Sequence, residues 1–317
     1  MENKNIVVIG SYLVALVMNS KRIPLTGETL MAKNFRQVHG GKGSNQAVQS
    51  ARLGADTSFI GRVGKDNFGQ AFIQLCEDEK INHEFVFQSN DLPTGAGFII
   101  CDDNGNNIIT IDIAAINEFG ETDIDAAMDI ISSNSIVLIQ LEIPLETALY
   151  AAKRAKEKGA TVILNPAPAQ DLSGYNLAMI DFLTPNETEA RICLGLSPDI
   201  ALSDEEAALQ LVKLRCANVI LTLGEKGCLL CNKTVVLEVP GFHINVVDTT
   251  GAGDGFNAGL AVGLSEGKDI LEALVFANAV GALAVTKPDT IPSYHLRKEV
   301  DEFIWMSCEN DRDKQAH

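Results

Sequence analysis

The central part of the chain alternates between short apolar runs and longer amphipathic stretches. Three runs are apolar at nearly every position, as is typical of strands buried on both faces, and they lie at Ile136 to Leu141, Thr161 to Leu164 and Val219 to Leu223. The stretches around them have the length and periodicity of helices, and they lie at Glu146 to Lys158, Glu187 to Leu194 and Glu205 to Arg215. This alternation predicts an α/β fold in which helices cover both faces of a mostly parallel sheet.

The first third of the chain has a different pattern. Pro24 to Met31 and Gly95 to Cys101 have strand character, and the polar segment Asp102 to Asn107 is a strong hairpin signal. Because hairpin partners are antiparallel, these pieces cannot all join a parallel sheet. We therefore expect a single α/β domain over residues 1–317, with a small β lid inserted at about residues 12–37 and 94–116.

Composition and charge narrow the possible functions. The 317 residues carry 25 Lys and Arg against 42 Asp and Glu, a formal net charge of −17, and 46% of them are apolar. This apolar content supports a large core, whereas the negative charge repels nucleic-acid phosphates and anionic lipid head groups. We therefore expect neither nucleic acid nor a membrane as a partner, and an anionic ligand only where basic groups or helix amino ends reverse the local field.

Several features indicate a cytoplasmic protein without a structural metal. The apolar stretch Ile6 to Met18 is too short to span a bilayer and is not preceded by basic residues, so we interpret it as a buried strand that runs into a loop at Gly10 and Ser11. Seven cysteines, an odd number scattered along the chain, suit a reducing compartment. Cys228 and Cys231 lie in an apolar run and the histidines lack metal-ligand spacing, so we expect a buried strand there and not a metal site.

The densest cluster of candidate chemistry is the segment Asp248 to Gly259. Its glycines, between Gly251 and Gly255, precede an apolar-periodic stretch and predict a loop that opens into a helix, where backbone N–H groups and the helix dipole can bind an anion. Asp254 is unexpected beside an anion unless it accepts a proton from a nucleophilic hydroxyl. Two interpretations of Asp254 stay open, a general base and an ordinary N-cap.

A second glycine-rich loop, Gly40 to Asn45, leads into a predicted helix. Its glycines allow close approach of a ligand, and the ammonium of Lys42 and the amide of Asn45 can both reach sugar hydroxyls. The loop therefore suits a polyol site, with a plain turn before a helix as the alternative.

A third segment, Thr184 to Glu189, follows a predicted strand. Asn186 and Glu189, three residues apart at a helix start, share one face and suit a hydrated magnesium shell, a phosphate contact or a simple helix cap. A fourth segment, Leu221 to Gly227, is a predicted strand that ends in a glycine turn.

These four segments occur in the order found in the ribokinase-like (PfkB) family of sugar kinases, which the chain resembles over about residues 5–305. Three short motifs make it look closest to the ribokinase branch, and they are Asn165 to Pro168, Gln140 to Glu142 and Ala284 to Thr286. The resemblance implies a three-layer α/β sandwich with a mostly parallel central sheet and a small β lid that closes over the sugar. It also implies a homodimer formed through that lid.

The family's reaction converts ATP and a sugar into ADP and a sugar phosphate. The resemblance therefore implies a carbohydrate kinase that acts on a primary hydroxyl of a pentose-like sugar. Asp254 matches the family's base, and its anion hole matches Gly251, Ala252 and Gly253. The sugar-binding positions match Gly41, Lys42, Gly43, Asn45, Glu142 and Asp254. The nucleotide-binding positions match Asn186, Thr222, Gly224, Gly227, Gly253 and Asn278.

The resemblance also implies two metal ions. Magnesium accompanies ATP, and Glu189 matches a position that contacts it through water. A monovalent cation, which we expect to be potassium, lies beside the family's anion hole with mostly carbonyl ligands. Its matching positions are Asp248, Thr250, Val285, Pro288 and Ser293.

Two departures from the family pattern concern the sugar and the cation. The family's first strand ends in Gly-Ser-x-Asn-x-Asp, whose Asn and Asp hold sugar hydroxyls, but Leu13 and Ala15 occupy those places. D-ribose, converted to ribose 5-phosphate, is the default substrate, and we expect the missing carboxylate to weaken ribose binding or to indicate another sugar. Three nearby residues are candidates for a compensating polar contact, and they are Tyr12, His39 and Asp112.

The second departure is the segment Pro288 to Thr290, where ribokinases commonly carry a Gly-Ala turn. Asp289 in this turn would either supply a carboxylate to the cation or distort its site.

Two other functions stay open. A nucleoside kinase of the same fold would need more aromatic side chains near the lid than Tyr12 and an aromatic content of 6% indicate. A non-catalytic sugar-binding regulator would have no need for the carboxylate of Asp254 beside a phosphate.

Overall fold

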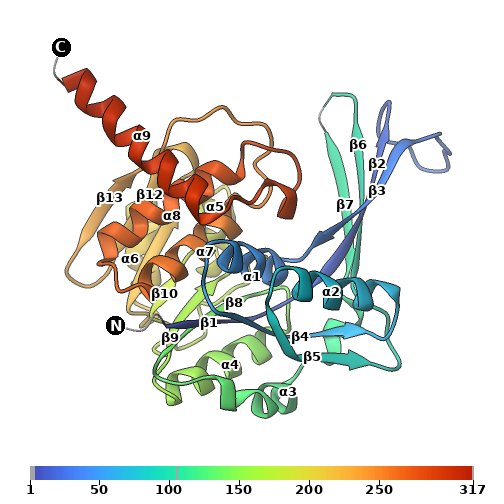
Figure 1. The fold of residues 1–317 in the computed structure, drawn as a ribbon, viewed down its shortest axis with the longest axis horizontal. Helices are drawn as coiled ribbons and strands as arrows, with labels where there is room; N and C mark the ends of the chain where they lie inside the picture. Colours follow the sequence, from blue (N-terminus) through green and yellow to red (C-terminus); the bar gives the residue numbers. More distant parts are fainter. Residues whose placement is uncertain (1–3, 105, 316–317) are drawn as a thin grey trace.

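The computed structural model describes residues 4–104 and 106–315, with side chains described through residue 309. Its main sheet has nine strands in the order β13-β12-β11-β10-β9-β8-β1-β4-β5 (Figure 1). Their bounds are β1 Asn5–Ile9, β4 Thr57–Gly64, β5 Asn82–Ser89, β8 Ser135–Gln140, β9 Thr161–Asn165, β10 Phe182–Leu183, β11 Asn218–Thr222, β12 Gly227–Cys231 and β13 Val236–Pro240. Neighbouring strands from β5 to β11 run parallel, and β12 is antiparallel to both β11 and β13.

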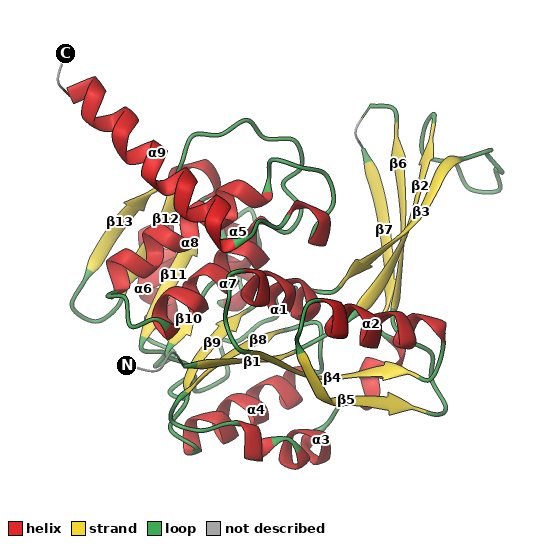
Figure 2. Ribbon diagram, in the orientation of Figure 1, coloured by secondary structure: helices red, strands yellow, loops and turns green. Residues whose placement is uncertain are grey.

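Helices cover both faces of this sheet (Figure 2). One layer contains α3 Glu121–Ala126, α4 Leu145–Glu157, α5 Glu187–Cys193 and α6 Asp204–Val212. The other contains α1 Lys42–Arg52, α2 Asn67–Asp78, α7 Ala252–Ser265 and α8 Ile270–Ala284, with α9 Arg297–Gln315 packed on α8. Within β8, Val137 and Ile139 belong to the first core while Ile136 and Leu138 belong to the second, because successive strand residues face opposite sides.

A second sheet of four strands, which we call the lid sheet, projects from the main body (Figure 1). Its order is β3-β2-β6-β7, with bounds β2 Leu13–Ser20, β3 Lys33–Gly40, β6 Ala96–Asp102 and β7 Asn107–Asp112. β2 is antiparallel to β3 and parallel to β6, and β6 and β7 form an antiparallel hairpin.

The strands and helices predicted for the middle of the chain are present, and so is the predicted hairpin. The prediction of a strand at Pro24 to Met31 is wrong. This segment contains a turn in which the N–H of Glu28 donates to the carbonyl of Leu25 and Gly27 has a φ of 82°. The strand that pairs with β2 is β3, whose polar sequence Lys-Asn-Phe-Arg-Gln-Val-His-Gly hides its strand character.

Most of the cysteines are buried, whereas Cys101 is half-buried and Cys308 is exposed. Cys228 and Cys231 are buried in β12, and all seven cysteines are free thiols. Among the described residues, no group of three His, Cys, Asp or Glu side chains is placed to hold a metal ion directly. In the same part of the chain, none of the helices combines the length and the apolar composition needed to cross a membrane.

The central strand β8 generates a stability prediction. Ile139 is fully buried, so Ile139→Ala should lower the free energy of unfolding by about 2–5 kcal/mol, measured by urea denaturation. Ile200 is 45% exposed, so the matched control Ile200→Ala should change that free energy by less than about 0.5 kcal/mol. Equal effects of the two substitutions would contradict the assignment of the core.

Candidate active site

The candidate site is organised around Asp254 in the first turn of α7. Gly251 is the N-cap of this helix, with a φ of 83°, and Asp254 is the third helical residue. The N-cap interpretation of Asp254 is therefore wrong, because the backbone before it has already turned into the helix. Its side chain is only 5% exposed.

Two amide side chains of α1 hold the Asp254 carboxylate. Asn45 Nδ2 donates to Oδ2 at 2.9 Å, and Gln46 Nε2 donates to Oδ1 at 3.0 Å. A buried carboxylate without such partners would be strongly unfavourable. The two donors therefore fix the orientation of this group at the point where α1 meets α7.

Gln46 was not predicted from the sequence, although it links three elements. Its Nε2 also lies 3.1 Å from Oδ1 of Asn165 at the end of β9, and its Oε1 accepts from Gln140 Nε2 at the end of β8, at 2.7 Å. The available signal was its place directly after Asn45, together with Gln140 and Asn165 in motifs already noted. Gln46 thus links the ends of β8 and β9 to Asp254, so the packing of these two strands helps to fix where the carboxylate lies.

A second polar cluster lies where the glycine-rich loop meets Glu142. Oε2 of Glu142 accepts hydrogen bonds from the Ser11 hydroxyl and from the backbone N–H of Lys42, the latter at 2.7 Å. Burial raises the pKa of the Glu142 carboxyl, and Lys42 offsets this only in part. Burial would lower the pKa of the Lys42 ammonium, but the carboxylates of Asp254, Glu142 and Glu189 raise it above its ordinary value. The charges of these three carboxylates therefore favour the protonated form of Lys42.

Only glycine fits at two positions of this loop. Gly41 has a φ of 96°, in the left-handed region that side chains disfavour. At Gly43 an added Cβ would lie 2.5 Å from the backbone nitrogen of Ser11 and 2.7 Å from its carbonyl oxygen. The loop can therefore pack directly against the segment between β1 and β2.

A cavity of about 830 Å³ lies beside the amino end of α7. All six residues predicted to bind nucleotide line it, and they are Asn186, Thr222, Gly224, Gly227, Gly253 and Asn278. The segment 241–246 also lines it, and no motif in the sequence had pointed to this segment. Asn278 holds the start of that segment, because its Nδ2 donates to the carbonyls of Val239 and Pro240 at 3.2 and 3.1 Å.

Asn186 and Glu189 form a reciprocal capping box at the start of α5. The N–H of Glu189 donates to Asn186 Oδ1 at 2.8 Å, and the N–H of Asn186 donates to Glu189 Oε2 at 2.9 Å. Among the described residues, Oε1 of Glu189 has no hydrogen-bond donor of its own, so one oxygen is free to face a hydrated ion. Such a residue fits magnesium, which keeps several waters and is held largely by nucleotide phosphates.

The residues predicted for the monovalent cation lie on two segments that contact each other. The N–H of Val247 donates to the carbonyl of Val285 at 2.8 Å, and the N–H of Asp289 donates to Asp248 Oδ2 at 3.1 Å. Although burial alone would raise it, hydrogen bonds from Thr250 and Asp289 and the charge of Arg36 lower the pKa of Asp248. Thr250, Pro288 and Ser293 could contribute hydroxyl or carbonyl oxygens, which are the hard donors that a hard cation prefers.

The structure does not bring the three compensating candidates to Ala15. Ala15 pairs with Val38, so the side chains of both point to one face of the lid sheet. Val14 pairs with His39 and with Ala96, and Ala96 pairs with Asp112, which places His39 and Asp112 on the opposite face. Tyr12 is fully buried, and its hydroxyl lies 2.9 Å from His39 Nδ1. The strand register therefore places His39 and Asp112 on the face away from Ala15, and a compensating contact to the sugar stays a prediction.

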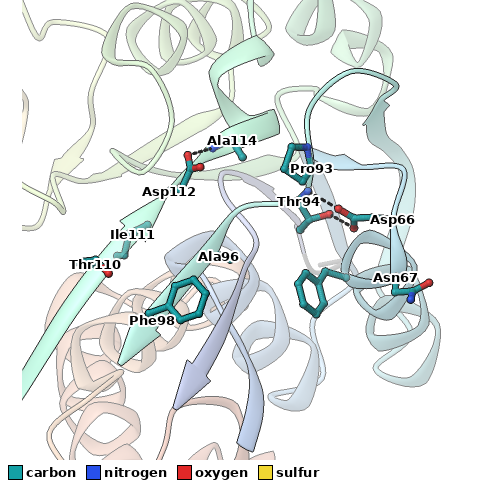
Figure 3. A pocket seen from close by; sticks show the side chains of 11 residues that line it. Asp66, Asn67, Pro93, Thr94, Ala96, Phe98, Thr110, Ile111, Asp112 and Ala114 are labelled. Carbon is teal, nitrogen blue, oxygen red and sulfur yellow. Dashed lines mark hydrogen bonds between the residues drawn. The ribbon is translucent and has the colours of Figure 1, made fainter. Parts of the chain in front are cut away.

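The opposite face of the lid sheet borders a separate cavity of about 550 Å³ (Figure 3). Its carboxylates have structural roles. Asp66 accepts hydrogen bonds from Thr94, and Asp112 accepts one from the N–H of Ala114 (Figure 3). Asp66 also accepts one from the N–H of Gly69. This cavity is lined by neither Asp254 nor the glycine-rich loop.

Comparisons with known proteins agree on one family. The profile of the pfkB family carbohydrate kinases matches residues 3–297. The chain is 36% identical over 305 residues to a ribokinase of Haemophilus influenzae, covering 95% of this chain and 98% of that protein. It is 35% identical over 305 residues to a deoxyribokinase of Salmonella typhimurium, covering 96% and 99%. The solved structure of Arabidopsis thaliana ribokinase complexed with ribose and ATP matches with a TM-score of 0.82, at 32% identity, covering 96% and 99%.

The two glycines of the site generate opposite stability predictions. Gly43→Ala should lower the free energy of unfolding by about 1–3 kcal/mol, because its Cβ would collide with the Ser11 backbone. Gly253→Ala should leave it unchanged or raise it by up to about 1 kcal/mol, because an added Cβ meets no atom within 4 Å and alanine favours helix. Urea denaturation of both variants tests this, and a Gly43→Ala protein as stable as the wild type would refute the close packing.

Proposed function

The chain belongs to the pfkB family of carbohydrate kinases, and from this premise we propose how its residues phosphorylate a sugar. It is a ribokinase-type sugar kinase with ATP as the phosphoryl donor. The proposal concerns the roles of individual residues, the acceptor sugar and the assembly.

A single observation carries the assignment of roles. Asp254 is fixed by Asn45 and Gln46 at the amino end of α7, and Gly253, directly before it, lines the cavity that holds the nucleotide-binding candidates. A carboxylate oriented between a sugar loop and a phosphate-binding helix start is the arrangement that a general base for phosphoryl transfer requires.

In the proposed reaction, Asp254 removes the proton from the primary hydroxyl of the sugar. The hydroxyl oxygen forms a bond to the γ-phosphorus, and the bond from that phosphorus to the bridging oxygen breaks, so its electron pair leaves with ADP. The N–H groups at the start of α7, at Gly251, Ala252 and Gly253, stabilise the charge that develops on the transferring phosphoryl group. Lys42 lies close enough to Asp254 for their charges to interact, and it adds positive charge on the sugar side.

The polar side of the sugar site is proposed to consist of Gly41, Lys42, Gly43, Asn45 and Glu142. Magnesium, with Glu189 facing its water shell, would supply charge neutralisation on the phosphates of ATP. A potassium ion, held by Asp248, Thr250, Val285, Pro288 and Ser293, would add positive charge beside the anion hole.

The identity of the sugar depends on the lid sheet. D-ribose is the default acceptor, supported by the ribokinase relatives. The face that carries Ala15 also carries Leu13 and Val38, and it offers no carboxylate to pair with ribose hydroxyls. This apolar surface favours a sugar that lacks one of those hydroxyls, and a relative of similar identity is named a deoxyribokinase.

We also propose a cytoplasmic homodimer that assembles through the lid sheet. Large apolar side chains of this sheet are exposed, including Phe35 at 65%, Phe98 at 52% and Ile108 at 46%. Exposed apolar groups gathered on one sheet are typical of association surfaces. The seven free thiols suit a reducing compartment.

The role of Asp254 is tested by Asp254→Asn. The amide cannot accept the hydroxyl proton, so kcat for ADP release should fall at least about 100-fold, while sugar and ATP still raise the thermal midpoint. A matched control is Asp269→Asn, at the N-cap of α8, where asparagine caps equally well and kcat should stay near that of the wild type. Near-normal turnover of the Asp254→Asn protein would refute the base assignment.

The role of the lid face is tested by Ala15→Asp. A new carboxylate should accept hydrogen bonds from ribose hydroxyls and lower the KM for ribose by about tenfold or more. Ala15→Val adds bulk without an acceptor and should not lower it. The measurement is ADP release with a panel of pentoses, hexoses, deoxy sugars and nucleosides. An unchanged KM for ribose in the Ala15→Asp protein would mean that the sugar does not lie beside residue 15.

A further inference from the structure

One ion pair connects the lid sheet to the body of the protein. Arg36 Nη2 in β3 lies 3.1 Å from Oδ1 of Asp289, and the two side chains are 40% and 24% exposed. The other ion pairs of the lid that the described residues form, Arg22 with Glu28 and Lys33 with Asp103, stay within it. The Arg36–Asp289 pair is therefore the ionic contact across which lid and body can influence each other.

Arg36 reaches the body from the face of the lid sheet that carries Ala15. Arg36 pairs with Val17 and Val38 pairs with Ala15, so alternate residues of both strands share this face. Arg36, Val38 and Gly40 are partly buried, whereas Phe35 and Gln37 point to solvent. The guanidinium thus extends from the same surface that we propose to cover the sugar.

Asp289 occupies a backbone conformation that does not favour a side chain. Its φ is 64°, in the left-handed region that glycine adopts readily and aspartate adopts occasionally. A non-glycine residue in this region carries some strain, and such strain persists where the side chain has a function. The carboxylate of Asp289 contacts Arg36, a contact that glycine at this position could not make.

From Asp289 a short series of hydrogen bonds leads to the amino end of α7. The N–H of Asp289 donates to Asp248 Oδ2, and Asp248 Oδ1 accepts from the N–H and the hydroxyl of Thr250 at 2.9 and 2.6 Å. Thr250 directly precedes Gly251, whose carbonyl accepts from the Tyr294 hydroxyl at 3.3 Å. The loop that carries Asp289 therefore supports the start of the phosphate-binding helix.

The same loop is anchored to α1 on its inner side. Arg52 Nη1 donates to the carbonyls of Ile291 and Tyr294 at 2.7 and 3.1 Å, and Gln49 Nε2 donates to the carbonyl of His295 at 3.0 Å. Because these contacts tie the loop to the body, a lid that binds Asp289 is held relative to the helix start and not to a mobile segment.

We propose that Arg36 is a positioning residue. By binding Asp289, it holds the lid sheet over the sugar site and in a fixed position relative to the amino end of α7. The inference rests on the proposed sugar kinase function. Loss of the pair should free the lid, weaken retention of the sugar and admit water to the phosphoryl group, while the proton transfer at Asp254 is left intact.

The test uses Arg36→Gln, Asp289→Asn and the double variant of the full chain. Amide hydrogen exchange in residues 33–40, measured without ligands, should become faster to the same degree in all three proteins. The KM for the best sugar of the panel should rise about fivefold in each single variant and no further in the double variant. The kcat should stay within about twofold, and ADP release without sugar should increase relative to that with sugar. Arg36→Lys keeps the positive charge, so its hydrogen exchange and its KM should lie between those of the Arg36→Gln protein and the wild type.

Two controls separate positioning from folding. Asp289→Gly removes the carboxylate and also the strain at φ 64°, so its thermal midpoint without ligands should stay within about 2 °C of the wild type while the KM still rises. Lys33→Gln removes the pair with Asp103 inside the lid, at 3.8 Å, and should leave both exchange and KM unchanged.

Each outcome decides the proposal. Unchanged exchange in residues 33–40, additive effects in the double variant, or a lowered thermal midpoint with an unchanged KM would overturn the role of Arg36. A wild-type protein that releases no ADP with any sugar would overturn the proposed function, and the exchange measurement would still show whether the pair restrains the lid.

Discussion

The arrangement of the whole site depends on the burial of one carboxylate among neutral amides. Asp254 is 5% exposed, and its two oxygens accept from Asn45 and Gln46, which lie more than 200 positions away in the chain. A carboxylate at this depth is acceptable only with such partners. The contact therefore requires α1 and α7 to pack side by side, and Gln140 and Gln46 extend the requirement to the ends of the central strands.

The two sides of the sugar site differ in chemistry. In the proposed sugar site the body contributes Lys42, Glu142 and Asp254, and the charges of the two carboxylates raise the pKa of the Lys42 ammonium. The lid sheet carries Leu13, Ala15 and Val38 on one face, and in our proposal this face covers the sugar without accepting a hydrogen bond through these side chains. Our proposal assigns proton transfer and the fit of the sugar to different elements, so the preferred sugar can change while the reaction stays that of the family.

Sequence patterns indicated the fold well wherever periodicity was local. Buried strands such as β8 and β9 and the helices between them follow from apolar runs and amphipathic spacing. The same reasoning mistook Pro24 to Met31 for a strand and missed β3, an edge strand whose mostly polar sequence lacks a regular apolar alternation. It also grouped Tyr12, His39 and Asp112 with Ala15, since the register that separates the faces of a sheet leaves no local signal.

Local sequence patterns sufficed to predict the strands and helices of the middle of the chain, the glycines of the tight loops and the carboxylate in the first turn of α7. These features follow from backbone conformation and from short motifs, which neighbouring residues specify. The contact between Gln46 and Asp254 became visible only in the folded chain, and so did the contact between Arg36 and Asp289, which are 253 positions apart. The local sequence around one residue of such a pair carries no signal for the other. The contacts form only when the sheet and its helices pack together.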